Sequence, residues 1–239
     1  MLNNIKGIIF DYGGTLDTNS THWSEVLWEG FEHENVPVDK QQFREAYVYA
    51  ERALAKNPLI KPKHNFLDLL RIKVNIETSY LAESNYWIVE DGVRKDVSEA
   101  IAVYCNNYVL KVLEKSREVL RVLSEKYPLC LVSNFYGNIK TIIDDFELNY
   151  FNSIIESAIV GVRKPDSRIF QLGVTALGLP AENIVVVGDS FSKDIVPANS
   201  IGCQTVWIKG IGWGDENDVD TNGMPTIVLS DIAQLTTIL

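Results

Sequence analysis

The feature that most constrains this chain is a short apolar run near its start that stops at a carboxylate. Residues 5–10 read Ile-Lys-Gly-Ile-Ile-Phe, and Asp11 follows directly, with Gly13 and Gly14 two and three positions later. A run this short and this apolar predicts a buried strand of a central sheet better than a helix. The glycines predict a tight turn whose backbone amides come close to a bound anion. The alternative is an ordinary loop that only requires turn residues.

Composition and charge exclude several classes of function. With 239 residues, of which 46% are hydrophobic, the chain can bury a sizeable core. Its net charge of −10 disfavours binding to nucleic acid and to anionic membrane surfaces. No apolar run approaches the roughly 20 residues that span a bilayer, and the first residues lack the regions of a signal peptide. We therefore expect a soluble, cytoplasmic protein without nucleic-acid or membrane partners.

The cysteines point to packing and not to chemistry. Cys105, Cys130 and Cys203 are scattered and form no CxxC pair. This pattern favours neither a disulfide framework nor a zinc site, so we expect three small buried apolar side chains.

The first half of the chain after the glycine turn has helical periodicity. Apolar residues recur at the spacing of one helical face in four stretches, from residue 23 to 31, 39–56, 66–81 and 97–108. Residues 18–112 are therefore expected to be nearly all helical. Aromatic residues at helical spacing usually pack in a core, and we expect this for Trp23, Trp28, Phe31, Tyr47 and Tyr49.

The remainder alternates between apolar runs and amphipathic stretches. An amphipathic helix from residue 115 leads into an apolar run at 129–132, and further apolar runs follow at 184–187, 206–208 and 226–229, while the short stretch 153–157 stands between two predicted helices. This alternation predicts a parallel sheet with helices on both faces, which binds ligands beyond the carboxyl ends of its strands. The helical block of residues 18–112 is an insertion after the first strand and is well placed to cover that crevice as a cap.

Polar side chains follow three of these predicted strands. Asp11, Ser133 and Asp189 lie at strand ends, and Asp194 comes shortly after the last of them. Three carboxylates gathered at one sheet edge repel one another unless a cation lies among them, and an all-oxygen set suits a hard ion such as Mg²⁺. With the ammonium of Lys164 and the turn amides, these groups make a receptor for a phosphoryl group.

Asp11 is suited to attack phosphorus in such a receptor. An aspartate is ionised at neutral pH, because its reference pKa is about 3.9, and it needs no general base to act as a nucleophile. An aspartyl-phosphate would then form and hydrolyse.

Four motifs in order resemble those of the haloacid dehalogenase-like hydrolase superfamily, in its helical-cap, phosphatase-like branch. They are Asp11-Tyr12-Gly13-Gly14-Thr15, Ser133-Asn134, Lys164-Pro165 and the stretch from Gly188 to Asp194. The resemblance spans nearly the whole chain. It implies a Rossmann-like, doubly wound α/β core formed by residues 1–17 and 113–239, with an inserted all-helical cap at residues 18–112.

The resemblance also implies residue roles. Asp11 is the nucleophile and Lys164 its catalytic partner, while Asp194 either binds the metal through water or orients Lys164. The implied magnesium ligands are Asp11, Gly13 through its backbone carbonyl, Asp189 and Asp194. The implied substrate-binding residues are Gly14, Thr15, Ser133, Asn134 and Lys164.

Gly13 departs from the pattern of phosphatases in this superfamily. They carry at this position a second aspartate that protonates the leaving oxygen and later deprotonates the attacking water. General acid-base help of this kind, typically worth about 10²–10⁴-fold, is missing here or comes from elsewhere. The conceivable substitutes are Tyr12, Asp17 and a residue of the cap.

The leading expectation is a magnesium-dependent hydrolase of a small phosphorylated metabolite, such as an acyl phosphate, whose leaving group needs little protonation. One alternative is carbon–phosphorus cleavage of a phosphonate, in which relatives use a cap lysine as a Schiff base. Lys40, Lys56, Lys61 and Lys63 are the candidates for that role. Another alternative is a regulatory protein that holds magnesium and phosphate but turns over poorly. Dehalogenation is less expected, because Asp189 retains a carboxylate that the resembling dehalogenases lack.

Two further stretches imitate known motifs. The glycine-rich residues 210–214 have the wrong spacing for a dinucleotide turn, and we expect a connecting loop. Residues 218–223 imitate the start of a calcium loop, but Leu229 stands where a glutamate is needed, so we expect a solvated acidic loop.

Overall fold

The structure is a computed structural model that describes residues 1–211, 221 and 223–239. Its centre is a six-stranded sheet in the order β3-β2-β1-β4-β5-β6, and every neighbouring pair is parallel. The strands are β1 (Gly7–Phe10), β2 (Leu129–Ser133), β3 (Ser153–Glu156), β4 (Ile184–Gly188), β5 (Gln204–Ile208) and β6 (Ile227–Leu229). The predicted doubly wound α/β fold is confirmed.

Strand β1 is central because its residues are apolar on both faces. Ile8 and Phe10 pack on one face of the sheet and Ile9 on the other, and all three are fully buried. The first face is covered by α4 (Asp91–Ser124), α5 (Ile139–Asp145) and α9 (Leu235–Ile238), and the second by α7 (Arg168–Leu177) and α8 (Val196–Ser200). The strand register aligns Phe10 with Leu131 and Val187, so β1, β2 and β4 end at one edge.

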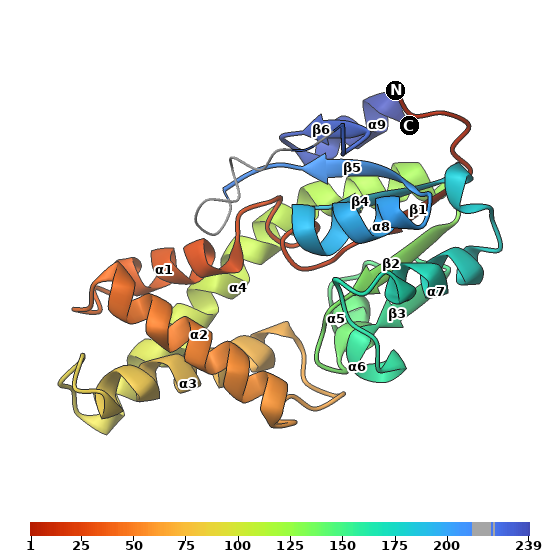
Figure 1. Cartoon of the computed structure of the whole chain (residues 1–239). Helices are drawn as coiled ribbons and strands as arrows, with labels where there is room; N and C mark the ends of the chain where they lie inside the picture. Colours follow the sequence, from red (N-terminus) through yellow and green to blue (C-terminus); the bar gives the residue numbers. More distant parts are fainter. Residues whose placement is uncertain (212–220, 222) are drawn as a thin grey trace.

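The inserted segment forms a layer of helices beside the sheet (Figure 1). It contains α1 (Trp23–His33), α2 (Lys40–Lys56), α3 (Phe66–Glu83) and the first part of α4. Capping boxes begin two of these helices: Asp39 pairs with Gln42 at α2, and Asn65 pairs with Asp68 at α3. Each box satisfies backbone N–H groups that the first helical turn leaves without a partner, which fixes where the helix begins.

Helix α4 joins the two helices that periodicity suggested near residues 97–108 and 115–123. It is one helix of 34 residues, about 50 Å long at 1.5 Å per residue, and it runs from the cap helices onto the sheet (Figure 1). Ile101, Cys105 and Val109 are buried along the same stripe as Leu113, Leu120 and other residues nearer the sheet. The buried stripe keeps its period along α4 while its packing partners change from the cap to the sheet. This change of partners explains why the sequence pattern suggested two helices.

Other expectations from the sequence have simple outcomes. The three cysteines are free and buried, as predicted. Within the part of the chain that the structure describes, no helix is long and apolar enough to cross a membrane. The expected loops at residues 210–214 and 218–223 lie mostly outside the described residues.

Candidate active site

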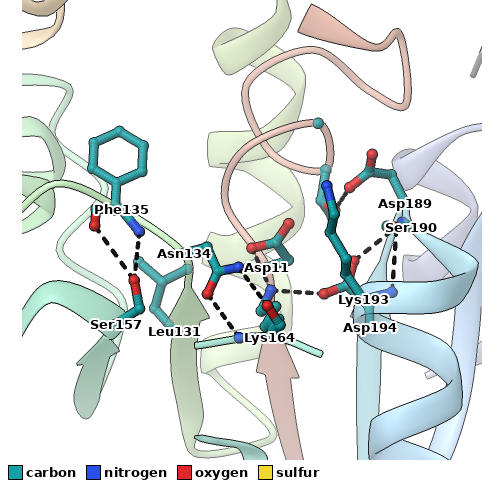
Figure 2. Close-up of polar contacts among 12 residues, drawn as sticks. Asp11, Leu131, Asn134, Phe135, Ser157, Lys164, Asp189, Ser190, Lys193 and Asp194 are labelled. Carbon is teal, nitrogen blue, oxygen red and sulfur yellow. Dashed lines mark hydrogen bonds and ion pairs between the residues drawn. The ribbon is translucent and has the colours of Figure 1, made fainter. Parts of the chain in front are cut away.

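The predicted site residues converge at the carboxyl edge of the sheet (Figure 2). Asp11 follows β1, Ser133 ends β2 and Asp189 follows β4. Asp194 lies on η2 (Phe191–Ile195), and Lys164 comes from the loop between α6 (Ser157–Val160) and α7. Residues separated by up to 183 positions thus meet because parallel strands present their ends on the same side.

Lys164 lies between two carboxylates (Figure 2). Its Nζ is 2.6 Å from Asp11 Oδ1 and 2.7 Å from Asp194 Oδ1. Burial lowers the pKa of Lys164, but the two carboxylates raise it further, and the pKa lies above its usual value. Lys164 therefore stays protonated, and it places a fixed positive charge beside Asp11.

The carboxylates outnumber this cation. Oxygen atoms of Asp11, Asp189 and Asp194 all lie within 4.8 Å of one another. Burial raises the pKa of Asp11 to about 6, with Lys164 opposing the shift and Asp194 adding to it. Burial and the other two carboxylates raise the pKa of Asp189 well above its usual range. One ammonium is therefore not enough to keep all three carboxylates ionised, which is the electrostatic setting that a divalent cation fits.

The two glycines of the turn have opposite surroundings. A Cβ on Gly14 would lie 2.3 Å from Asp189 Oδ2, and the φ of Gly14 is +94°, so this position needs glycine for both space and conformation. A Cβ on Gly13 would have no atom within 4 Å, and its φ is outside the left-handed region. Thr15 is fully buried behind the turn, where its hydroxyl donates to Asp189 Oδ1 at 3.0 Å.

The second motif holds the lysine loop. Asn134 Oδ1 accepts a hydrogen bond from the Lys164 backbone N–H at 2.9 Å, and Asn134 Nδ2 donates to the Lys164 carbonyl at 3.1 Å (Figure 2). The Asn134 side chain is thus used to fix the backbone of Lys164. Ser133 is 2% exposed and borders the same cavity as Asp11.

A cavity of about 910 Å³ opens between this edge and the cap. Of the predicted site residues, Asp11, Gly13, Gly14, Ser133, Asn134, Lys164, Asp189 and Asp194 border it. Cations outnumber carboxylates in the lining although the whole chain is acidic. The lining cations are Arg52, Lys56, Lys73, Arg163, Lys164, Lys193 and Lys209, and the carboxylates are Asp11, Asp17, Glu51, Asp189 and Asp194. A cavity of this charge attracts an anionic ligand locally.

The cap contributes residues that the sequence did not identify. Lys73 and Glu51 line the cavity and form an ion pair between α3 and α2. The sequence feature that could have identified Lys73 is its charge on the apolar face of α3, one turn from Leu69 and Leu70. Of the cap aromatics expected in a core, Phe31 is fully buried, and Trp23, Trp28 and Tyr47 pack against the buried core, whereas Tyr49 is exposed. Trp23 and Tyr47 also border the cavity.

The candidates for the missing acid differ in where they lie. The Tyr12 ring packs edge-on against Phe66 and Phe135, and its buried hydroxyl has no hydrogen-bond partner within residues 1–211, 221 and 223–239. Tyr12 does not border the cavity. Asp17 borders the cavity, where its carboxyl accepts from the Gly14 N–H at 2.7 Å and from Trp23 Nε1 at 3.0 Å. Burial raises the pKa of Asp17 to about 7, against the effect of these hydrogen bonds.

A sequence model of one family matches most of this chain. The family is described as haloacid dehalogenase-like hydrolase, and the match covers residues 5–202. The chain belongs to this family, as its four motifs and the arrangement of Asp11, Lys164, Asp189 and Asp194 indicated.

Among named relatives, phosphatases and dehalogenases both occur. A glyceraldehyde 3-phosphate phosphatase of Pyrococcus furiosus is 28% identical over 156 residues, covering 61% of this chain and 62% of the relative. The corresponding enzyme of Methanothermobacter thermautotrophicus is 32% identical over 92 residues, and 41% of its length is covered. An (S)-2-haloacid dehalogenase of Pseudomonas putida is 25% identical, with 98% of this chain and 96% of the relative covered. The chain thus spans about half the length of the phosphatases.

Solved structures of the same fold extend over the whole chain. The HAD-hydrolase YfnB of Bacillus subtilis, a structure bound to magnesium, has a TM-score of 0.60 at 19% identity, with 99% of both chains covered. A dehalogenase has a TM-score of 0.65 at 17% identity, with 100% of this chain and 99% of the other covered. At these identities the likeness shows the fold, and it does not decide between the two activities.

Proposed function

We propose that this protein is a magnesium-dependent phosphatase of small phosphorylated metabolites that forms an aspartyl-phosphate on Asp11. The observation that carries the proposal is the placement of Asp11 within 2.6 Å of the Lys164 ammonium, in a cluster of three carboxylates at the floor of the cavity. Several relatives are named as phosphatases of phosphate esters, and these names support a phosphoryl group as the group that Asp11 attacks.

The donor set fits magnesium. Asp11, Asp189 and Asp194 offer oxygen atoms within 4.8 Å of one another, and magnesium prefers such hard ligands. Retention of Asp189 at this edge also argues against dehalogenation as the reaction. We assign these carboxylates and the Gly13 carbonyl to the ion, which when bound would supply charge neutralisation for the anionic substrate.

Asp11 and Lys164 then perform the chemistry. A carboxylate oxygen of Asp11 attacks phosphorus, the bond from phosphorus to the leaving oxygen breaks, and water later cleaves the aspartyl-phosphate to release phosphate. Lys164 reduces the repulsion between the carboxylate and the incoming phosphoryl group, because its charge is held 2.6 Å from Asp11. Ser133 and the amides of the glycine turn are assigned to the phosphoryl oxygens.

For the acid that Gly13 does not provide, we propose Asp17. It borders the cavity and its pKa of about 7 leaves it partly protonated at neutral pH, which suits a group that both donates and accepts a proton. Tyr12 does not serve, since it is fully buried and does not border the cavity.

The cap lysines do not favour carbon–phosphorus cleavage. Lys40 is paired with Glu25 on the surface at 2.5 Å, and the exposed Lys61 donates to the Pro58 carbonyl at 2.7 Å. Of the lysines considered for a Schiff base, Lys56 borders the cavity, but it is exposed. The buried Lys73 is held protonated by Glu51, and a Schiff base requires a neutral amine.

The test is turnover of a panel of phosphate monoesters, acyl phosphates and phosphonates, with magnesium and with a chelator. We expect phosphate release that depends on magnesium, and a loss of about 10⁴-fold or more in Asp11→Asn. Denaturation of the unchanged protein during turnover should trap phosphate on a peptide that contains Asp11. Magnesium binding without turnover of any substrate would favour a regulatory, binding protein instead.

A further inference from the structure

We propose that Lys73 and Glu51 form a recognition site on the cap wall of the cavity that binds hydroxyl groups on the non-reacting end of the substrate. The inference rests on the proposed phosphatase function and names its substrate class: phosphate monoesters of a polyhydroxylated alcohol, such as a sugar or polyol. The pair borders the same cavity as Asp11 but comes entirely from the cap helices α2 and α3.

Lys73 is an unusual residue for its position. It is 5% exposed and lies on the buried face of α3, among Leu69, Leu70 and Val74. Its Nζ donates to Glu51 Oε1 and lies 4.3 Å from the centre of the Tyr47 ring. Burying an ion pair costs desolvation, and replacing one with apolar residues is often neutral or stabilising. A role in packing alone therefore does not explain why this charge is present.

The pair remains ionised and open to the cavity on one side. The side chain of Glu51 is 40% exposed, while that of Lys73 is 6% exposed. Burial raises the pKa of Glu51, but the Lys73 charge and hydrogen bond lower it further, with smaller contributions from Lys193 and His22. Those last two residues border the cavity from outside α2 and α3, so the pair faces the junction between cap and core.

Glu77 does not cancel the charge of Lys73. It lies one helical turn from Lys73, is fully buried, and neither of its carboxyl oxygens has a hydrogen-bond partner in the part of the chain that the structure describes. Burial raises its pKa to about 8, so it is mainly protonated at neutral pH. Lys73 therefore donates to Glu51 and can donate a further hydrogen bond to a ligand, since an ammonium carries three donors.

The chemistry of the pair selects its ligand. A carboxylate or second phosphate near Lys73 would meet the charge of Glu51, and an ammonium near Glu51 would meet Lys73. A hydroxyl avoids both conflicts, because it accepts from Lys73 and donates to Glu51. The neighbouring lining adds Trp23, Tyr47, Phe66 and Tyr136, whose rings can pack against the carbon skeleton of a sugar or polyol.

The test compares a hexose 6-phosphate with n-hexyl phosphate, which has the same number of carbons but lacks the hydroxyls and the ring oxygen. In Lys73→Met, which keeps the side-chain length, we expect kcat/KM for the hexose phosphate to fall about 10- to 100-fold, mainly through KM. Turnover of n-hexyl phosphate should stay the same or improve. Lys73→Arg should keep part of the preference, because it keeps the charge.

Lys40→Met is the matched control, because it removes a surface ion pair of the same cap, with Glu25, that does not line the cavity. It should leave both substrates unchanged. An equal loss on both substrates in Lys73→Met, or no loss, would overturn the recognition role. A preference of the unchanged protein for O-phosphoserine or a phosphorylated carboxylic acid over the hexose phosphate would overturn the hydroxyl assignment. Failure of the unchanged protein with acetyl phosphate and p-nitrophenyl phosphate would instead reject the phosphatase function itself.

Discussion

The cavity has a core wall at the sheet edge, with Asp11, Lys164, Asp189 and Asp194, and a cap wall on α2 and α3, with Glu51 and Lys73. The two walls hold their charged side chains in different ways. On the core wall, Lys164 contacts two carboxylates, and its backbone is held by both polar atoms of the Asn134 side chain. On the cap wall, Lys73 has Glu51 as its ion-pair partner, and the carboxyl oxygens of the nearby Glu77 have no hydrogen-bond partner among the described residues. The core wall is therefore built for fixed chemistry, and the cap wall leaves hydrogen-bonding capacity that a ligand can complete.

This difference indicates that the core wall carries out the reaction and the cap wall determines substrate selectivity. Strand ends of the parallel sheet place catalytic groups with little freedom, because β1, β2 and β4 each pair with a strand on both sides. Side chains on packed helices are positioned by a few contacts, and a change there can alter selectivity without disturbing the reaction. Substitutions in one wall at a time therefore test whether the rate of the reaction and the substrate preference can be changed separately.

After the loss of the nucleophile itself, the largest effect on turnover is expected from Gly14→Ala in the core wall. The added methyl would lie 2.3 Å from Asp189 Oδ2. The backbone at this position has φ +94°, which alanine rarely adopts. Since displacement of a catalytic group by about 1 Å can cost 10²-fold, we expect a loss of ~10²-fold or more in kcat/KM on every substrate. Steady-state kinetics with hexose 6-phosphate and acetyl phosphate measure it. Gly13→Ala is the control and should retain activity, because that position is open.

Asp17→Asn should produce a smaller loss that depends on the leaving group. An alkyl phosphate releases a poor leaving group and needs the proton from Asp17, so we expect a fall of roughly 10- to 100-fold. An acyl phosphate needs little protonation and should change by a few-fold at most. A similar loss on n-hexyl and acetyl phosphate would show that Asp17 only braces the loop through Gly14 and Trp23.

Gly13→Asp should increase activity by about tenfold on alkyl phosphates. The position has room for a side chain, and a carboxyl there would restore the acid that other phosphatases of this superfamily carry. The gain should be largest in the Asp17→Asn background, where the alternative acid is absent. Gly13→Asn serves as the control, because it fills the same space without a proton to donate. No gain in either background would contradict the assignment of the missing acid to this position.

Glu77→Gln should leave turnover at neutral pH unchanged and alter the pH dependence of stability. The pKa of Glu77 is raised from 4.5 to about 8 in the folded protein, so the folded state holds a proton that the unfolded state releases. The free energy of unfolding should therefore fall as pH rises from about 4.5 to 8, by an amount on the order of 5 kcal/mol, and then level off. Urea unfolding at pH 5 and pH 8.5 should show a flatter profile in the variant. Identical profiles would mean that Glu77 is not buried as the structure places it.

The sequence predicted those features that depend on residues close together in the chain, such as strands and their ends. Short apolar runs predicted five of the six strands, and parallel strands bring their ends to one edge. The exception is β3, in which two of the four residues are polar. The strand ends grouped Asp11, Ser133 and Asp189, whereas Lys164, in the loop before α7, was added through its motif. The continuity of α4 was missed for a related reason, since periodicity reports a buried stripe and not which surface covers it.

The sequence by itself determined the α/β fold, because strand propensity and spacing along the chain are sufficient for it. The resemblance of its four motifs to the superfamily then marked Gly13 as unusual. The tertiary structure alone decided that Asp17 and not Tyr12 borders the cavity, and that Lys73 meets Glu51 on its wall. Those facts depend on how helices pack against each other and against the sheet. Residues far apart in the chain make these contacts, and no local pattern specifies them.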